Sequence, residues 1–378
     1  MAPEEYEDLS DAEVVRTSRD DEALRQRLQD WLATRLPGGA EPRVSEISAP
    51  SASGMSSETL LFDATWRGKD GSTESGAFVG RMAPAEHDLP TFPSYDMAMQ
   101  AGVLRLVGEV GVPVPRVRWL ETDPGPLGAP FFVMERLRGR VPGDVPPYLA
   151  AGWVFEATDE ERRRLQDATV AAIARIHSVD LEKSETGFLE FDEPGDTPLR
   201  RHVANQRSYY AWLTDGGRSS PLIERTFAWL DAHWPNETST VVSWGDARIG
   251  NVMYAEDGFE PVAILDWEMA GLGTRELDLG WLCFMHTYFF QVLLEQAGAP
   301  GLPRFLRADD IAETYGKLTG HTVEDLRWYL VYGGLRHAII MSRINERMVH
   351  FGQAESPADP DDRIPHRYTL ANMLEGRF

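Results

Sequence analysis

Three polar side chains near the middle of the chain have the types and the spacing that could handle a phosphate group. Asp246 and Asn251 are five positions apart in a polar stretch, and Asp266 ends an apolar run that begins at residue 262. Phosphoryl transfer needs a carboxylate that orients the attacking hydroxyl and hard oxygen ligands that hold Mg²⁺ on the phosphates. In that chemistry Asp246 would be the base, and Asn251 and Asp266 would bind the metal ion.

The segments around these three residues predict short hairpins that would position them. Apolar runs at residues 241–242 and 252–254 flank the polar stretch, and the Asp257-Gly258 pair stands where a turn would lead into residues 262–265. Alternatively, the aspartates and the asparagine are ordinary turn residues that bond their own backbone. The ordered recurrence of all three favours the catalytic interpretation.

With their surroundings, these residues resemble the aminoglycoside phosphotransferase and choline kinase-like family. The resemblance rests on the D-x-x-x-x-N spacing from Asp246, on the sequence D-W-E from Asp266, and on the run E-L-D-L-G-W at residues 276–281. It extends over about residues 24–349. The longer sequence D-W-E-M-A, together with Arg81, is closest to the branch that includes the kinase-like domains of some acyl-CoA dehydrogenases.

The resemblance implies an α+β fold, namely a bilobal protein-kinase-like fold with a β-rich N-lobe and a mostly helical C-lobe. We expect an N-terminal helical extension at residues 1–39, the N-lobe at 40–138, and the C-lobe with the catalytic loop and the acceptor cleft at 139–378. The candidate residues for lining that cleft are Glu268, His286, Tyr332, Arg336 and His337.

Local patterns predict the individual elements. Thr158 and Glu161 form a capping box at the start of a helix that ends near His177. The other elements expected are helices at 20–36, 95–110, 221–234, 277–294 and 323–348, and strands at 60–62, 77–81, 111–117 and 128–137.

In the N-lobe, the resemblance places the nucleotide phosphates between a turn and a cation. Gly54, Ser56 and Ser57 would form the turn, because small residues let backbone amides approach phosphate oxygens; an ordinary hairpin is the alternative. Arg81 stands in place of the usual lysine, and its guanidinium can clamp phosphate oxygens. Gln100 stands where the family has a glutamate that holds the cation, and a solvated helix residue is the alternative there.

Further roles follow from the same resemblance. The backbone near Glu135 and Leu137 would contact the adenine, and Arg248 would neutralise charge that develops during transfer. Trp244 replaces a histidine two positions before the base, and we interpret it as a brace because an indole only donates a hydrogen bond. Asp278 would either support the catalytic loop from behind or cap the following helix.

Composition limits the classes of function and partner. The 378 residues suffice for two packed lobes, and the net charge of −23 argues against a nucleic-acid partner. The charge would attract a polycationic acceptor such as an aminoglycoside, although solubility alone would also explain it. No uninterrupted apolar run approaches ~18 residues, so no membrane association is expected. The single cysteine, Cys283, favours a buried thiol in a reducing, cytoplasmic location.

We therefore expect a kinase that transfers the γ-phosphate of ATP, with Mg²⁺, to a hydroxyl of an aminoglycoside-like or other hydroxylated small molecule. The departures from the family pattern at Arg81, Gln100 and Trp244 suggest an alternative, a non-catalytic nucleotide-binding scaffold. No sequence feature specifies an oligomeric state.

Overall fold

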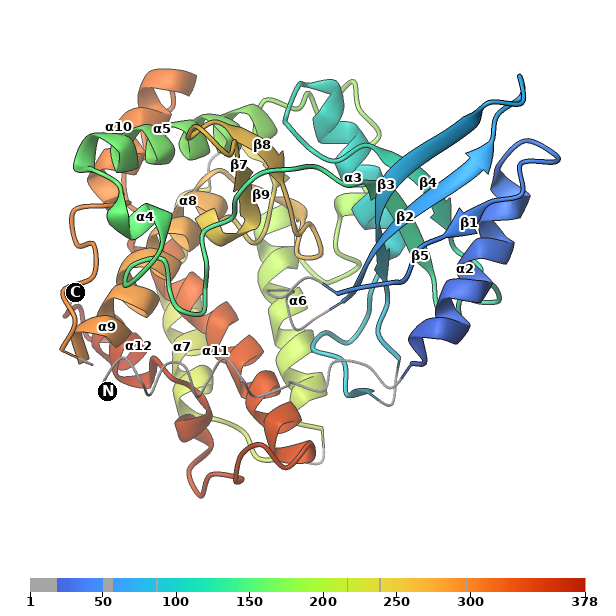
Figure 1. Cartoon of the computed structure of the whole chain (residues 1–378). Coiled ribbons are helices and arrows are strands. Elements are labelled where there is room, and N and C mark those ends of the chain that lie inside the picture. Colours follow the sequence, from blue (N-terminus) through green and yellow to red (C-terminus); the bar gives the residue numbers. More distant parts are fainter. Residues whose placement is uncertain are drawn as a thin grey trace. The chain divides into compact units, whose positions relative to one another are not determined.

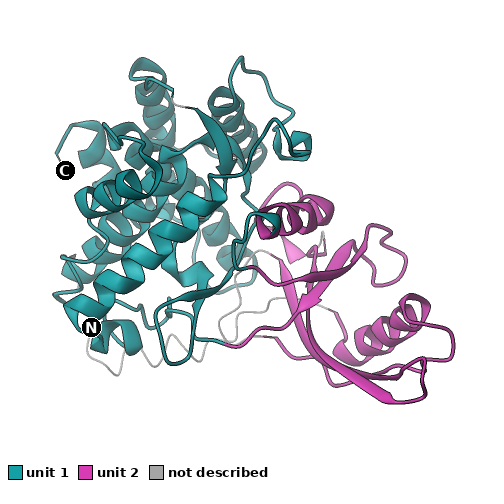
Figure 2. Cartoon of the chain, turned by 90° about the horizontal axis from the view of Figure 1, so that it is seen from above, with its two compact units in different colours: residues 1–12, 109–113, 139–378 teal, residues 13–108, 114–138 magenta. Residues whose placement is uncertain are grey.

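The computed structural model of the chain describes most of its residues, namely 19–49, 57–85, 88–215, 217–237, 239–296 and 298–377. Their contacts divide the chain into two units (Figure 2). The β-rich unit comprises residues 13–108 and 114–138, and the helical unit comprises residues 1–12, 109–113 and 139–378.

The β-rich unit is built on a five-stranded antiparallel sheet with the strand order β1-β2-β3-β5-β4 (Figure 1). Its strands are β1 (Arg43–Val44), β2 (Glu58–Arg67), β3 (Thr73–Met82), β4 (Val117–Glu121) and β5 (Phe131–Glu135), accompanied by the helices α2 (Asp21–Arg35) and α3 (Met97–Glu109).

The sheet confirms the expected strands except for the one placed at residues 111–117. That strand was wrong in all but its last residue, because β4 begins only at Val117. Pro113 and Pro115 have no backbone N–H to donate to a neighbouring strand, so the segment that holds them stays outside the ladder. β4 is an edge strand of the sheet.

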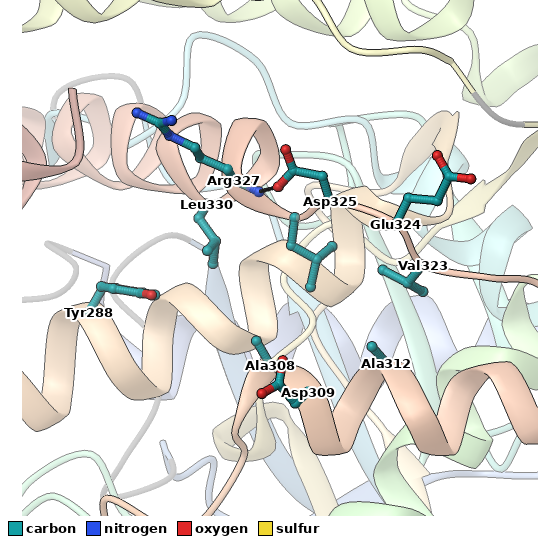
Figure 3. A pocket seen from close by; sticks show the side chains of 10 residues that line it. Tyr288, Ala308, Asp309, Ala312, Val323, Glu324, Asp325, Arg327 and Leu330 are labelled. Carbon is teal, nitrogen blue, oxygen red and sulfur yellow. Dashed lines mark hydrogen bonds between the residues drawn. The ribbon is translucent and has the colours of Figure 1, made fainter. Parts of the chain in front are cut away.

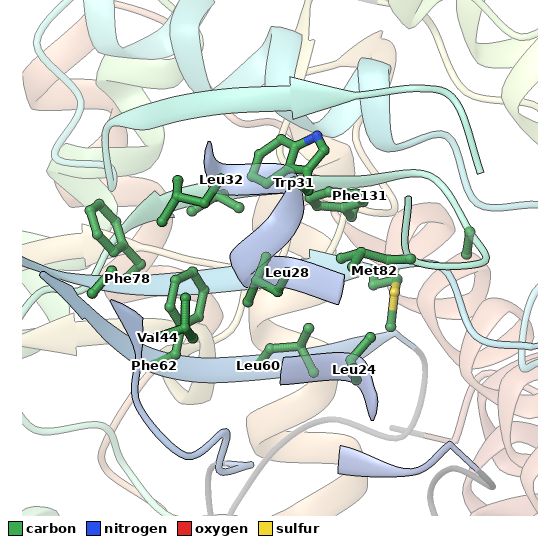
Figure 4. Close-up of a cluster of buried hydrophobic side chains, with 14 residues drawn as sticks. Leu24, Leu28, Trp31, Leu32, Val44, Leu60, Phe62, Phe78, Met82 and Phe131 are labelled. Atoms are coloured by element: carbon green, nitrogen blue, oxygen red, sulfur yellow. The ribbon is translucent and has the colours of Figure 1, made fainter. Parts of the chain in front are cut away.

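Helix α2 supplies much of the core of the β-rich unit (Figure 4). It begins after Asp20, whose carboxylate accepts a hydrogen bond from the Ala23 amide at 2.7 Å, and it ends before the sequence P-G-G. Four of its side chains are buried in one cluster with apolar side chains of the sheet: Leu24, Leu28, Trp31 and Leu32 with Val44, Leu60, Phe62, Phe78, Met82, Phe131 and Val133. The helix that the sequence sets apart as an extension is thus part of the packing of this unit.

The helical unit contains the elements that carry the predicted catalytic residues. The α-helices are α4 (Trp153–Glu156), α5 (Asp159–Ile176), α6 (Pro198–Leu213), α7 (Pro221–Ala232), α8 (Glu276–Cys283), α9 (Val292–Gln296), α10 (Ala308–Thr319), α11 (Arg327–His350) and α12 (Arg367–Leu374). Shorter segments are the 3₁₀ turns η2 (Gly187–Leu189), η3 (Ile249–Asn251) and η5 (Pro360–Arg363) and the π-helical η4 (Phe284–Gln291). The long helix α11 packs against α6, α7, α8 and α12.

The predicted capping box at the start of α5 is confirmed. Glu161 N donates to Thr158 Oγ1 at 3.2 Å, and Thr158 N donates to Glu161 Oε2 at 2.8 Å. Both bonds satisfy amides that the first turn of a helix leaves without partners.

Two small antiparallel ladders interrupt the helices. β7 (Val252–Tyr254) pairs with β8 (Pro261–Ile264), which confirms the hairpin expected at Asp257-Gly258. β6 (Thr240–Ser243) pairs with β9 (Gly271–Thr274), a strand that the sequence analysis missed. The sequence of β9 is G-L-G-T, and its two glycines have low strand propensity.

The stretch from α8 through η4 into α9 differs from the amphipathic helix expected at residues 277–294. Every residue of α8 is buried, so the first two turns of the stretch have no solvated face. By length and composition alone, Glu276–Glu295 could cross a membrane, but 72% of its most apolar window is buried inside the protein. A helix that is apolar on all sides is typical of a protein core as well as of a membrane span.

Candidate active site

The loop that follows β6 presents Asp246, and its backbone conformation depends on Gly245. Gly245 has a φ of 91°, a region that residues with a side chain rarely adopt. A Cβ atom at this position would lie 2.0 Å from the carbonyl oxygen of Met269. Only glycine therefore allows the loop to pass this close to the segment after β8.

Hydrogen-bond donors hold both oxygens of the Asp246 carboxylate. Oδ1 accepts the indole N–H of Trp281 at 2.7 Å. Oδ2 accepts Asn251 Nδ2 at 2.6 Å and Arg248 Nε at 3.3 Å. These bonds fix the orientation of the carboxylate. The Asp246 side chain is 15% exposed, so it still reaches the surface of the unit.

Asn251 bonds this carboxylate, and its backbone is joined to the residue that precedes Asp266. Asn251 donates its Nδ2 to Asp246, so its amide oxygen is the atom left to ligate a cation. Leu265 N donates to Asn251 O at 2.8 Å, which ties the end of the β7–β8 hairpin to the loop. Asp266 follows with a φ of 58°, an unusual value for a residue with a side chain.

Trp244 fixes that unusual segment. Its indole Nε1 donates to Leu265 O at 2.8 Å and to Asp266 O at 3.2 Å. The side chain is fully buried. The structure thus shows the bracing that we expected of this residue, since an indole N–H can donate to the carbonyls on either side of Asp266.

Arg248 is paired with a second carboxylate that the sequence analysis missed. Its Nη1 lies 2.9 Å and 2.7 Å from the two carboxylate oxygens of Asp144. Burial alone would lower the pKa of Arg248, but the charges of Asp246, Asp144 and Asp266 outweigh it and hold the pKa above its ordinary value. Arg248 is therefore a permanent cation beside the candidate base.

Asp278 anchors the backbone of the catalytic loop. It accepts hydrogen bonds from Trp244 N at 2.8 Å, from Gly245 N at 3.0 Å and from Ser243 Oγ at 2.8 Å. Burial alone would raise its pKa, but hydrogen bonds from His177 and from the two amides outweigh it and lower the pKa. The alternative that Asp278 caps its helix is wrong, because α8 begins two residues earlier.

The helix α11 also contacts the loop. Arg336 Nη2 donates to Gly245 O at 2.9 Å, and its guanidinium carbon lies 4.5 Å from the centroid of the Trp281 ring. The expectation that Arg336 lines the acceptor cleft is wrong, because it is only 2% exposed. The same correction applies to three other residues expected there, which are buried as well: His286, Tyr332 and His337.

The N-lobe candidates belong to the β-rich unit. Gly54 and Ser56 lie outside the described residues, whereas Ser57 is buried at the start of the β2–β3 hairpin. Arg81 is opposite Thr59 in that hairpin, and its Nη1 donates to Thr59 Oγ1 at 2.9 Å. Ser57 and Arg81 are thus at the same end of the two strands.

The remaining N-lobe candidates lie on α3 and at the end of β5. Gln100 is 3% exposed, so its interpretation as a solvated helix residue is wrong. Glu135 is the last residue of β5 and pairs with Arg118 at 3.1 Å, and Leu137 follows it, partly buried.

A pocket elsewhere in the helical unit contains none of these residues. It is lined by residues of η4, of α10, of the segment that leads into α11 and of the first turn of α11: Tyr288, Ala308, Asp309, Ala312, Val323, Glu324, Asp325, Leu326, Arg327 and Leu330 (Figure 3). Asp325 accepts a hydrogen bond from the Arg327 amide at 2.7 Å, one of the amides that the first turn of a helix leaves without a backbone partner.

Comparison with solved structures defines the class of fold. A putative aminoglycoside phosphotransferase from Ralstonia eutropha matches with a TM-score of 0.64 at 23% identity, covering 93% of this chain and 98% of that chain. Aminoglycoside phosphotransferase APH(4)-Ia, in a ternary complex with AMP-PNP and hygromycin B, matches with a TM-score of 0.54 at 14% identity, covering 92% and 98%. The expected α+β fold, the bilobal kinase-like fold, is confirmed.

Comparison of the sequence then identifies the family. Residues 61–318 match the model described as "Phosphotransferase enzyme family", which is more than half of the chain. The chain belongs to this family of phosphotransferases. The resemblance stated from the motifs is therefore confirmed.

Curated relatives confirm the expected branch. Acyl-CoA dehydrogenase family member 10 of Mus musculus is 27% identical over 287 residues, which are 74% of this chain and 25% of that protein. Probable acyl-CoA dehydrogenase IBR3 of Arabidopsis thaliana is 28% identical over 285 residues, which are 71% of this chain and 33% of that protein. The matched region thus spans about a quarter to a third of these relatives.

Proposed function

We propose that this phosphotransferase is a small-molecule kinase that transfers the γ-phosphate of ATP to a hydroxyl group. The observation that carries the proposal is the Asp246 carboxylate, which donors on two sides hold in one orientation at the end of a braced loop. Catalysis of phosphoryl transfer consists mostly of positioning and electrostatic stabilisation, so a fixed carboxylate is the feature that the reaction needs.

In the proposed reaction, Asp246 orients the acceptor hydroxyl and accepts its proton. The acceptor oxygen forms a bond to the γ-phosphorus while the bond from that phosphorus to the bridging oxygen of ADP breaks. Each carboxylate oxygen has more than one lone pair, so the bonds from Trp281 and Asn251 leave Asp246 able to accept another. Arg248, a permanent cation beside Asp246, would neutralise negative charge on the transferred group.

The donor chemistry of Asn251 and Asp266 fits Mg²⁺. An amide oxygen and a carboxylate are hard ligands, and Mg²⁺ in phosphotransferases takes one or two protein carboxylates with phosphate and water. When bound, Mg²⁺ would neutralise phosphate charge and orient the γ-phosphate.

The β-rich unit would supply the nucleotide contacts. Arg81 is the cation proposed to clamp the phosphates, and Ser57, with Gly54 and Ser56, the turn that covers them. Gln100 is proposed to support Arg81, and the segment of Glu135 and Leu137 to meet the adenine. These roles agree with the kinase-like fold and remain proposals for this chain.

For the acceptor, we propose a hydroxylated metabolite, with a cationic aminoglycoside as the second candidate. The first is favoured by the curated relatives, which are members of acyl-CoA dehydrogenase families. The second is favoured by the net charge of −23 and by the neighbour solved with hygromycin B. We also propose a cytoplasmic location, where ATP is abundant.

An ADP-release assay with magnesium-ATP tests the proposal. The panel should contain aminoglycosides and hydroxylated metabolites, including hydroxy acids, and Asp246→Asn should serve as the blank. An acceptor that raises ADP release in the wild type alone supports a kinase and names the substrate class. If ATP with magnesium stabilises the protein but no acceptor raises ADP release, the scaffold alternative is favoured.

A further inference from the structure

Trp281 bonds to the candidate base from outside the catalytic loop, and the proposed reaction assigns it no effect on the rate of transfer. It lies on α8, is 2% exposed, and places its indole N–H 2.7 Å from Asp246 Oδ1. The other carboxylate oxygen, Oδ2, is held by Asn251 and Arg248, which belong to the same loop as Asp246. One oxygen is therefore fixed from within the loop and the other from a separate helix.

Arg336 holds the Trp281 ring in place. Its guanidinium lies over the indole face at 4.5 Å, a distance at which a cation is attracted to the ring. The same guanidinium donates to the carbonyl oxygen of Gly245, the residue directly before Asp246. Arg336 thus connects the backbone of the loop to the side chain that bonds its carboxylate.

Burying the Arg336 guanidinium costs free energy that packing alone does not require, because an apolar side chain could fill the same space. Arg336 is 2% exposed, burial lowers its pKa, and its Nε has no hydrogen-bond partner among the described residues. Placing a buried cation with an unsatisfied donor is unfavourable unless other interactions offset it. Two of its contacts are with direct neighbours of Asp246, namely the carbonyl of the preceding residue and the indole that bonds its carboxylate, and a third is with the ring of Tyr332 at 5.9 Å.

We propose that Trp281 is a positioning residue for phosphoryl transfer, which keeps Asp246 Oδ1 in the orientation that engages the acceptor hydroxyl, with Arg336 fixing the indole. Two separately held oxygens prevent the carboxylate from rotating about its terminal bond. This inference rests on the proposed function, because it assigns Trp281 a role only if Asp246 acts as the base.

The variant Trp281→Phe tests the proposal because it removes the N–H and keeps an aromatic ring for Arg336. The matched control is Trp328→Phe on α11: Trp328 is also buried, and its Nε1 donates to Leu230 O at 3.1 Å. We expect Trp281→Phe to lower kcat by about 10- to 100-fold, since small misplacements of a reacting group have effects of this size. KM for ATP should stay within about twofold, and Trp328→Phe should keep both constants within about twofold.

Equal kcat values for the two variants would overturn the proposal, and so would a loss in Trp281→Phe that appears only in KM. Failure of the proposed function looks different, because the wild type itself would then release no more ADP than Asp246→Asn. A turnover-independent readout is the thermal unfolding of Trp281→Phe, Asp246→Ala and the double variant. A double variant whose Tm shift equals the sum of the single shifts would show that the two residues are not coupled and would also overturn the proposal.

Discussion

His177 Nε2 lies 2.9 Å from Asp278 Oδ2, and both side chains are almost completely buried. An ionised carboxylate can only accept, so the imidazole nitrogen is the donor in this pair. The other ring nitrogen, Nδ1, lies 2.7 Å from the Tyr315 hydroxyl, which accepts a hydrogen bond from Arg275 at 3.0 Å. A chain of hydrogen bonds thus leads from α10 to the carboxylate that anchors the catalytic loop.

Replacing Asp278 with alanine should destabilise the protein and abolish phosphoryl transfer. The change leaves three buried donors of the loop, on Ser243, Trp244 and Gly245, without an acceptor. Breaking a buried network of this kind costs about 3–5 kcal/mol of unfolding free energy. Urea denaturation measures the loss, and a midpoint equal to that of the wild type would show that Asp278 does not anchor the loop.

Much of the loop could be predicted from the sequence because its contacts are local. Asp246 and Asn251 are five positions apart, and this spacing was enough to single both out as candidate site residues. The residues outside the loop that bond to it could not be found from the sequence in this way. Asp144 is 104 positions from Arg248, and Arg336 is 91 positions from Gly245, and no spacing rule connects residues so far apart.

The same distinction applies to the elements. The capping box of α5 and the turn at Asp257-Gly258 are set by neighbouring residues, and both were predicted. Strand β9 was missed because only its pairing with β6 makes its G-L-G-T sequence a strand. The place of α2 in a core was missed because its apolar side chains meet strands as distant in the chain as β5.

Acidification should destabilise the folded protein already below about pH 6.5. Burial lowers the pKa of His202 to about 3 and the pKa values of His286 and His366 to about 4, from an ordinary value of 6.5. Between those limits the unfolded chain binds more protons than the folded one, so stability falls as the pH falls. Each such histidine contributes about 1.4 kcal/mol per pH unit within its window.

Urea denaturation at a series of pH values between 7 and 4 measures this slope. The variant His366→Gln, whose amide can still donate to Gly334 O, should show a shallower slope, while His350→Gln, at an exposed histidine, should keep the wild-type slope. A slope unchanged in His366→Gln would contradict the assignment of His366 as a neutral, buried group.

The variant Asp144→Asn should weaken catalysis without unfolding the protein. It removes one of the two carboxylates that hold Arg248, so the guanidinium gains freedom beside Asp246. Asp144 is 42% exposed, and the loss of such a pair typically costs no more than about 1 kcal/mol of stability. We expect kcat to fall several-fold with little change in Tm. Asp231→Asn, which breaks the exposed pair with Arg207, is the matched control and should leave kcat unchanged.

Gly245→Ala should inactivate the enzyme through one steric contact. A side chain at this position has two costs, a strained φ of 91° and a Cβ atom 2.0 Å from Met269 O. Gly320→Ala has only the first of these costs. Gly320, at the end of α10, has a φ of 73°, and a Cβ atom there meets nothing within 4 Å. Backbone strain alone costs about 1–2 kcal/mol.

If the close approach to Met269 is what fixes the loop, Gly245→Ala must move Asp246 away from Trp281 and Asn251. Its kcat should then fall by about 100-fold, because a misplacement of a reacting group by about 1 Å can have an effect of this size. Gly320→Ala should lose only the stability that backbone strain costs, about 1–2 kcal/mol, and should keep the wild-type kcat. Full activity in Gly245→Ala would mean that the loop can place its carboxylate without this contact, and the glycine would then serve only the backbone turn.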